Sequence, residues 1–250
     1  MSAETKKLGE SSQAEAEMSF LEHLEELRWR IIYSLLGIVI GTIISWIFID
    51  FLVEDILLKP AADAHITLQN LRPFGQLFLF LQVAIISGFV LSIPNVFYQT
   101  WKFIAPALKS NEKKYVGFIV SFSTVCFITG IVFAYFVMLP MTLKFAVQFG
   151  TQKIENNFAI SEYFSIIMSV MLASGLVFEL PMLSFALSKL GILKPSFMKK
   201  YRRHAIVIIM FAAAILTPGT DPVAQILLAI PLVLLYEISI FVSKLSQKKN

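Results

Sequence analysis

Two carboxylates in this sequence stand where acids are unusual. Glu112 is the one acid in residues 99–114, QTWKFIAPALKSNEKK, a segment that holds four lysines and separates two long apolar runs. Glu179 lies inside an apolar run, where a buried carboxylate costs several kcal/mol unless it is neutral or paired. Glu112 could bind a cationic partner at a membrane surface. The residues alone favour the alternative, in which Glu112 lies in the first turn of the next helix with Ser110 as N-cap, because the helix dipole stabilises an acid there.

A second acidic group precedes the first apolar run. Ser19 followed by Glu22 is a capping-box pattern, and it predicts a short amphipathic helix from residue 19. Glu22 and Glu26 lie four residues apart on one face of this helix, a like-charge spacing that costs about 0.2–0.5 kcal/mol in isolation. Arg30, four residues beyond Glu26, could be an internal partner. Alternatively, the two acids form a patch for an external cation.

Polar residues in the later apolar runs raise a related question. Pro181 leaves a carbonyl one turn earlier without its helical donor, so a protonated Glu179 could donate a hydrogen bond nearby. Acids without a role are rare in mid-membrane, which favours a functional Glu179. Gln225 and Glu237 occupy the last apolar run, and Glu237 is near enough to its end to reach Lys244 or water.

Composition determines the class of protein. With 57% hydrophobic and 15% charged residues among 250 and a mean hydropathy of +0.74, the sequence favours a polytopic helical membrane protein over a soluble protein with a very large core. Cys126 is the single cysteine and cannot form an internal disulfide. We find no P-loop, no Ser/His/Asp set and no His/Cys cluster with metal-ligand spacing, so we expect no enzyme activity, cofactor or metal.

Six membrane spans are expected, and the last two are short. Their approximate ranges are 31–49, 74–98, 115–139, 163–190, 204–217 and 223–236. The fifth corresponds to only ~21 Å of helix, against a hydrocarbon core of ~30 Å. Residues 1–18 are polar and predicted to be disordered, residues 19–243 form one transmembrane domain, and residues 244–250 form a basic tail.

The distribution of basic residues predicts the orientation. Of the 21 lysines and arginines, 17 lie in the N-terminus, the second and fourth connections and the tail, and four lie in the alternate connections. The positive-inside rule therefore places both termini in the cytoplasm. The basic residues that give the formal net charge of +4 lie between the spans, where they determine the orientation, so we expect no nucleic-acid partner. The first 30 residues are polar and acidic, so the first apolar run is expected to be an uncleaved anchor.

Five motifs, in order, resemble the TatC family of twin-arginine protein translocases. They are HLEELRWR, QTWKFIAPALKSNEKK, AYFVMLP, FELPM and LTPGTDPVAQILLAIPLVLLYEI, and the resemblance extends from about residue 19 to residue 244. The resemblance implies an all-α, cup-shaped bundle of six transmembrane helices, multi-pass in a bacterial inner membrane. It implies a cytoplasmic receptor for twin-arginine signal peptides of folded cargo, with transport driven by the proton gradient. The implied partners are single-span TatA/TatB-type subunits, membrane lipid and further copies of the chain.

The resemblance also implies roles for individual residues. Glu26 and Glu112 would contact the two arginines, and Phe103 would support that site. Glu179 would be the polar group on the concave membrane face that engages partner helices, and Gln225 would belong to the partner-docking edge. Glu22 matches no family role. The chemistry is consistent, because a guanidinium binds a carboxylate through a fork that lysine cannot reproduce.

Two other classes of function remain open from the residues alone. A proton-coupled secondary transporter would use Glu179 and Glu237 as a relay, and it should show paired broken helices in two halves. No such symmetry appears in the sequence. In a passive membrane scaffold, Glu26 and Glu112 would have no cationic ligand.

Overall fold

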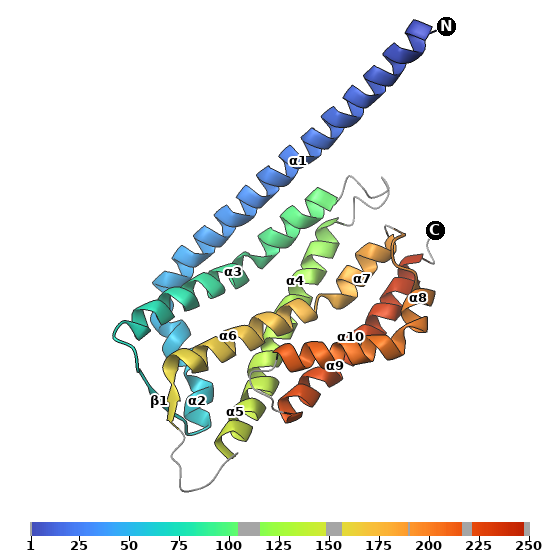
Figure 1. The fold of residues 1–250 in the computed structure, drawn as a ribbon. Helices are drawn as coiled ribbons and strands as arrows, with labels where there is room; N and C mark the ends of the chain where they lie inside the picture. The colour runs from blue at the N-terminus through green and yellow to red at the C-terminus, as the bar shows by residue number, and fades with distance from the viewer. Residues whose placement is uncertain (1, 105–115, 149–156, 190, 217–221, 248–250) are drawn as a thin grey trace.

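The chain forms helices that run back and forth between two ends of the molecule (Figure 1). The computed structural model describes residues 2–104, 116–148, 157–189, 191–216 and 222–247. The elements are α1 (Ser2–Ile47), η1 (Phe51–Leu57), α2 (Lys59–Asp63), β1 (Thr67–Gln69), α3 (Gly75–Ile104), α4 (Val116–Phe133), η4 (Ala134–Met138), α5 (Leu139–Gln148), β2 (Asn157–Ala159), α6 (Ile160–Val177), α7 (Leu180–Lys189), α8 (Pro195–Lys200), α9 (Arg202–Leu216) and α10 (Pro222–Gln247). We call the end that holds both chain termini the terminal end, and the opposite end, with η1, α2, β1 and β2, the outer cap.

Helices α1 and α3 form the most extensive helix pair. Glycines allow their backbones to touch, because a Cβ atom at Gly88 would lie 2.5 Å from the Cα atom of Thr42. The sequence predicts disorder to residue 18, whereas the structure has helix from Ser2. The cause is local composition, since Ala, Glu, Lys and Gln are strong helix formers. These first turns project beyond the other helices (Figure 1).

The outer cap is built from two segments that are distant in sequence. Strands β1 and β2 pair in parallel, with Thr67 opposite Asn157. The hydroxyl of Tyr163 donates a 2.8 Å hydrogen bond to the carbonyl of Leu57, and that of Tyr135 donates one of the same length to the carbonyl of Ile56. These bonds tie η1 to the helices below it. The two strands were not predicted, because segments of three residues are too short to show an alternating pattern of apolar and polar residues.

The third apolar helix is longer than the sequence predicts. Proline at position 140 suggests that the span ends near Leu139, but α5 continues the helix to Gln148. The preceding turns form the π-helix η4. A π-helical turn changes the hydrogen-bond register just before Pro140, where the missing amide would otherwise break the α-helical pattern.

The sixth helix corrects a second expectation. The sequence predicts a short last span that ends before Glu237, whereas α10 is one helix of 26 residues. Glu237 does not end it because its carboxylate accepts a 2.7 Å hydrogen bond from Arg202. Beyond that point α10 packs on α7, where the hydroxyls of Ser188 and Ser243 are hydrogen-bonded and buried. The preceding α9 is short, as expected, with 15 residues.

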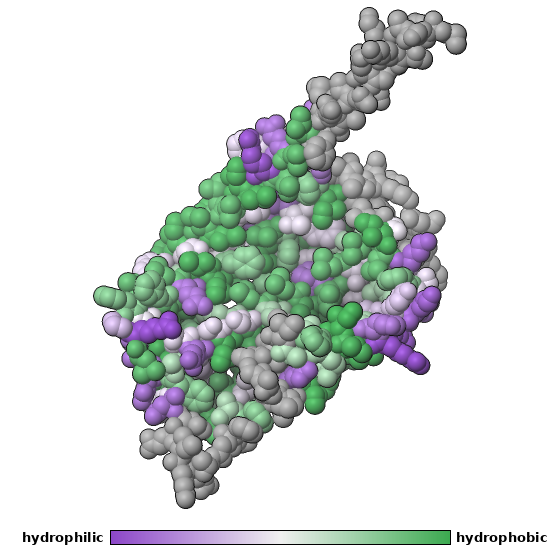
Figure 2. Space-filling view, in the orientation of Figure 1, coloured by the Kyte–Doolittle hydropathy of each residue, from purple (hydrophilic) through white to green (hydrophobic). Residues whose placement is uncertain are grey.

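Among the residues that the structure describes, five helical stretches are long and apolar enough to cross a membrane. They are Leu21–Ile47, Gly75–Ile104, Val116–Val147, Ile160–Lys189 and Leu228–Leu245. They correspond to five of the six expected spans, and α9 is shorter than this group. The face in Figure 2 is apolar across its middle, with hydrophilic residues towards its two ends. This distribution suits a bundle surrounded by lipid.

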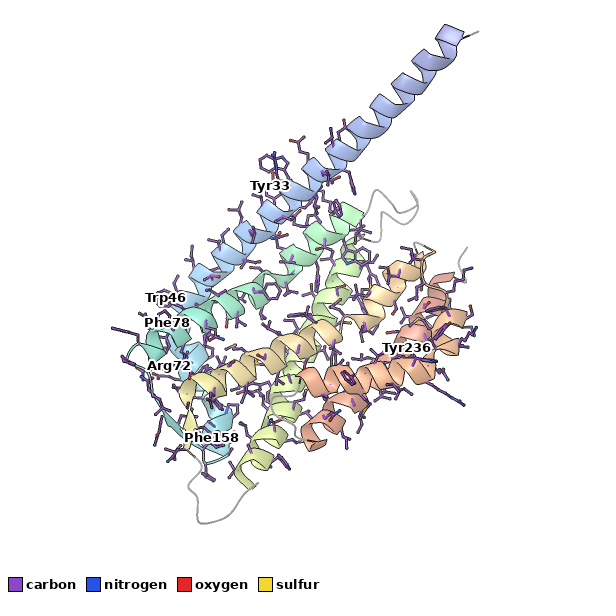
Figure 3. The ribbon with its side chains drawn as sticks, in the orientation of Figure 1. Tyr33, Trp46, Arg72, Phe78, Phe158 and Tyr236 are labelled. Atoms are coloured by element: carbon purple, nitrogen blue, oxygen red, sulfur yellow. The ribbon has the colours of Figure 1, made fainter. Side chains whose placement is uncertain are left out.

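Aromatic side chains lie near both ends of the apolar part of α1. Trp29 and Tyr33 stack with ring centroids 5.9 Å apart, and Trp46 lies towards the outer cap with 43% of its surface exposed (Figure 3). Trp29 and Trp46 are 17 residues apart, which is about 26 Å of helix and close to the ~30 Å hydrocarbon core. Trp and Tyr favour membrane interfaces, so these rings indicate where α1 enters and leaves the lipid.

Candidate functional site

A polar junction joins α1 to α3 near the terminal end of the pair. One guanidinium nitrogen of Arg30 donates a 2.8 Å hydrogen bond to Oε1 of Glu26, and the other donates a 3.2 Å bond to Oε1 of Gln99. Glu26 and Arg30 are four residues apart on α1, so their side chains share a face. The side chain of Glu26 is 33% exposed and that of Arg30 is 18% exposed. The carboxylate is therefore the accessible part of the pair.

The junction continues along α3 away from the terminal end. The side-chain amide of Gln99 donates to Oδ1 of Asn95 at 3.4 Å, and the amide of Asn95 donates to the backbone carbonyl of Tyr33 at 3.0 Å. Asn95 can approach α1 because position 37 is glycine; a Cβ atom there would collide with the Asn95 amide. We call Glu26, Arg30, Gln99 and Asn95 the junction residues.

The other predicted residues of this site are placed only in part. Phe103 is half-buried at the end of α3 and stacks on His23 of α1, with ring centroids 4.4 Å apart and planes 15° apart. His23 and Glu26 are three residues apart on one helix, so Phe103 and Glu26 lie at the same crossing of α1 and α3. Glu112 lies outside the described residues.

Glu179 interrupts the fourth apolar span, as Pro181 predicts. The helix stops at Val177 and resumes at Leu180, so Glu179 sits in the break between α6 and α7. The residue is buried, with 7% of its surface exposed, and the Ser123 side chain and the Phe127 backbone of α4 interact with its carboxyl group. Within the described part of the chain, its Oε1 has no hydrogen-bond partner. Glu179 therefore packs against α4 of its own bundle.

The predicted docking edge at α9 and α10 is held by polar contacts of its own. The side-chain amide of Gln225 donates a 3.0 Å hydrogen bond to the carbonyl of Met210 in α9. Glu237 is paired with Arg202 at 2.7 Å, and both side chains are nearly half exposed. The structure thus gives Glu237 a partner other than Lys244 or water. Gln225 and Glu237 both connect α10 to the segment around α9.

The described residues contain no group of three or more His, Cys, Asp or Glu side chains that could hold a metal ion. The junction can instead bind charge. A fixed, partly exposed carboxylate beside a stacked ring suits a cationic side chain that approaches from the terminal end.

The sequence interpretation missed three contributors to the junction, namely His23, Asn95 and Gln99. The signal for two of them was available. Asn95 and Gln99 are amides four residues apart, near the end of an apolar span, where polar side chains need partners. Their partners on α1 could not be identified, because that pairing depends on how two helices cross.

Comparisons with known proteins agree with this architecture. Residues 22–231 match the family model described as Sec-independent protein translocase protein (TatC). A TatC protein of Carboxydothermus hydrogenoformans is 38% identical over 93% of this chain and 96% of its own length, and one of Aquifex aeolicus is 37% identical over 93% and 98%. A crystal structure of the twin-arginine translocase receptor TatC superposes with a TM-score of 0.78, at 37% identity, over 90% of this chain and 99% of that chain.

These relatives are named as translocase components, which describes a transport role. Several apolar helices and a family match over most of the length lead to the same class of protein. The chain is a multi-pass membrane protein that belongs to the TatC family, as a component of the twin-arginine, Sec-independent protein translocase.

Proposed function

We propose that the junction at the terminal end of α1 and α3 is a receptor site for twin-arginine signal peptides of folded cargo. The observation that carries this proposal is the state of Glu26. Its carboxylate is one-third exposed, yet it is fixed by an arginine that is itself bonded to α3. A fixed carboxylate can select the planar fork of a guanidinium, whereas a mobile one accepts any cation.

The energetic contribution of each contact is moderate. A bidentate guanidinium–carboxylate pair at a partly desolvated surface contributes about 2 kcal/mol, or roughly thirtyfold in affinity. Two acids that each bind one arginine would distinguish a consecutive pair from a single one. Glu26 is one of these acids in the proposal and Glu112 is the other. Phe103, stacked on His23, supplies an apolar surface beside Glu26.

The proposed receptor faces the cytoplasm and recruits partner subunits within the membrane. The terminal end faces the cytoplasm at the inner membrane of a bacterium. This orientation is expected because 17 of the 21 basic residues lie in the N-terminus, the second and fourth connections and the tail, which alternate with the segments on the other side that hold the remaining four lysines and arginines. Glu179 and Gln225 contribute to the recruitment of single-span TatA/TatB-type subunits. Transport uses the proton gradient, and several copies of the chain act together in the receptor complex.

Peptide binding to the purified protein in lipid nanodiscs tests the receptor role. A twin-arginine peptide should bind more tightly than its twin-lysine counterpart. Glu26→Gln and Glu112→Gln should each weaken twin-arginine binding by about thirtyfold, because each removes one ion pair while keeping shape. Glu54→Gln is a matched control, since it removes the same charge from an exposed residue of the outer cap. Equal crosslinking of the peptide to all four proteins would refute the assignment.

A further inference from the structure

We infer that Arg30 is the positioning residue that presents Glu26 to the signal peptide and so gives the site its preference for arginine over lysine. The inference rests on the proposed receptor function. It adds a residue that touches no ligand and acts through Glu26. The guanidinium of Arg30 is shared between α1 and α3.

Arg30 is bonded on two sides. One nitrogen holds Glu26 on the same helix, and the other holds Gln99 on α3. Its Nε is buried and has no partner among the described residues. Only the planar fork of arginine has donors spaced to reach both acceptors, because a lysine carries a single point charge at the end of its stem. The orientation of Glu26 is therefore set by the position of α3.

The arrangement leaves room for a second arginine on Glu26. Arg30 contacts Oε1 of the carboxylate through one nitrogen, and a carboxylate offers about four acceptor positions. The guanidinium is the more buried member of the pair, at 18% exposure against 33% for Glu26. Arg30 therefore binds Glu26 from the protein side and leaves the outer side of the carboxylate to an incoming ligand. A signal peptide can bind without displacing Arg30.

Fixing the carboxylate favours arginine in particular. A guanidinium forms both hydrogen bonds when the carboxylate lies in the plane of the fork, and a carboxylate already held in place loses less conformational entropy on binding it. An ammonium group has no such requirement, because its three donors rotate freely around one charge. Loss of Arg30 should therefore reduce twin-arginine binding strongly, while twin-lysine binding stays the same or rises as Glu26 gains freedom and full charge.

The test compares two dissociation constants for each variant, one for a twin-arginine peptide and one for its twin-lysine analogue, in nanodiscs. We expect Arg30→Lys and Arg30→Gln to lower the preference for arginine by about tenfold, the order of one charge-assisted hydrogen bond. Arg202→Gln is the matched control, because Arg202 also binds a glutamate, at 2.7 Å, but between α9 and α10. Its preference should equal that of the wild type.

A double variant separates positioning from general damage. Once Glu26→Gln is present, the further change Arg30→Gln should have no additional effect on the preference, because Arg30 acts through the carboxylate. If Arg30→Gln does not accumulate, Gln99→Leu addresses the same question, since it releases Arg30 from α3 but keeps the pair with Glu26. We expect Gln99→Leu to lose part of the preference.

The outcomes are distinct. A wild-type protein without any preference would refute the receptor function itself. A wild type that prefers arginine and loses this preference with Glu26→Gln, but keeps it in the Arg30 and Gln99 variants, would overturn only the role of Arg30. Equal weakening of both peptides by Arg30→Lys would also overturn it, because a purely structural role changes affinity without changing selectivity.

Discussion

Gly88 of α3 lies directly against the backbone of Thr42 in α1, and a Cβ atom at Gly88 would come within 2.5 Å of the Thr42 Cα atom. The same crossing brings Gly41 against α3, where a Cβ atom would lie 2.6 Å from Oγ of Ser92. Ser92 donates its hydroxyl to the carbonyl of Gly37 at 2.6 Å. This close contact sets the distance between the two helices that carry the junction residues.

Gly88→Ala should therefore destabilise the protein. The added methyl group meets backbone atoms, which cannot rotate away, so we expect a loss of about 1–3 kcal/mol in the free energy of unfolding. Gly117→Ala is the control, because a Cβ atom there meets nothing within 4 Å. Thermal unfolding in detergent should show a lower Tm for the first variant and an unchanged or slightly higher Tm for the second. An unchanged Tm for Gly88→Ala would mean that α1 and α3 can separate without penalty.

Glu179 offers a test of function against stability. Glu179→Gln keeps hydrogen-bonding capacity and should retain much of the transport activity. Glu179→Leu should insert normally but reduce transport and partner recruitment, because the polar group in the helix break is lost. The apolar side chain loses the interactions with Ser123 and Phe127 but also removes the buried Oε1, which has no partner among the described residues, so Tm should change little. Signal-peptide binding should survive both changes.

Transport per membrane-inserted molecule is the quantity to measure for Glu179. If the residue serves only its own bundle, Glu179→Leu should lower Tm or abundance and leave transport per molecule intact. A fully active, normally recruited Leu variant would exclude a role in transport.

Tyr163→Phe should weaken the outer cap. Tyr163 is 2% exposed, and its hydroxyl bonds to the carbonyl of Leu57, so its removal leaves a buried acceptor without this donor. We expect a loss of about 1–3 kcal/mol in the free energy of unfolding. Tyr33→Phe makes the same chemical change at a side chain that is 46% exposed and should have little effect. Similar Tm values for the two variants would contradict the anchoring role of Tyr163.

Cysteine labelling tests the orientation in the membrane. In a Cys126→Ala background, a cysteine in place of exposed Gln69 in the outer cap should react with an impermeant maleimide in intact cells. A cysteine in place of exposed Ser196, at the start of α8, should react only after permeabilisation. The distribution of basic residues makes this the expected result. Labelling of the Ser196 position from outside would reverse the topology.

The course of the chain follows from the sequence because long apolar runs and charge asymmetry are local signals. The break at Glu179 was predictable for the same reason, since Pro181 removes a specific amide donor. The sequence allows two interpretations of Glu26, an internal pair with Arg30 or an external cationic ligand, because a spacing of four residues is compatible with both. The structure contains the internal contact with Arg30. In the proposed site, Glu26 binds both Arg30 and an arginine of the signal peptide.

Other features depend on contacts between distant parts of the chain. The sequence predicts too short a last helix because Glu237 ends the uncharged run. Its charge is paired with Arg202, a contact that the sequence does not reveal. The partners of Gln99 and Asn95 could be identified only from the packing of α3 against α1. Strands β1 and β2 could not be predicted because each pairs with a segment that is distant in the sequence.

The pairing of β1 with β2 has a consequence for the order in which the protein is made. Thr67 pairs with Asn157, a residue synthesised 90 positions later. The anchor of Leu57 is likewise Tyr163, which follows it by 106 positions. The first three apolar helices must therefore enter the membrane before the cap above them can close. Until the ribosome has delivered the fourth helix, β1 lacks its partner strand and η1 has the hydrogen bond from Tyr135 but not the one from Tyr163. A nascent chain halted before residue 157 should therefore remain open to protease on that side of the membrane.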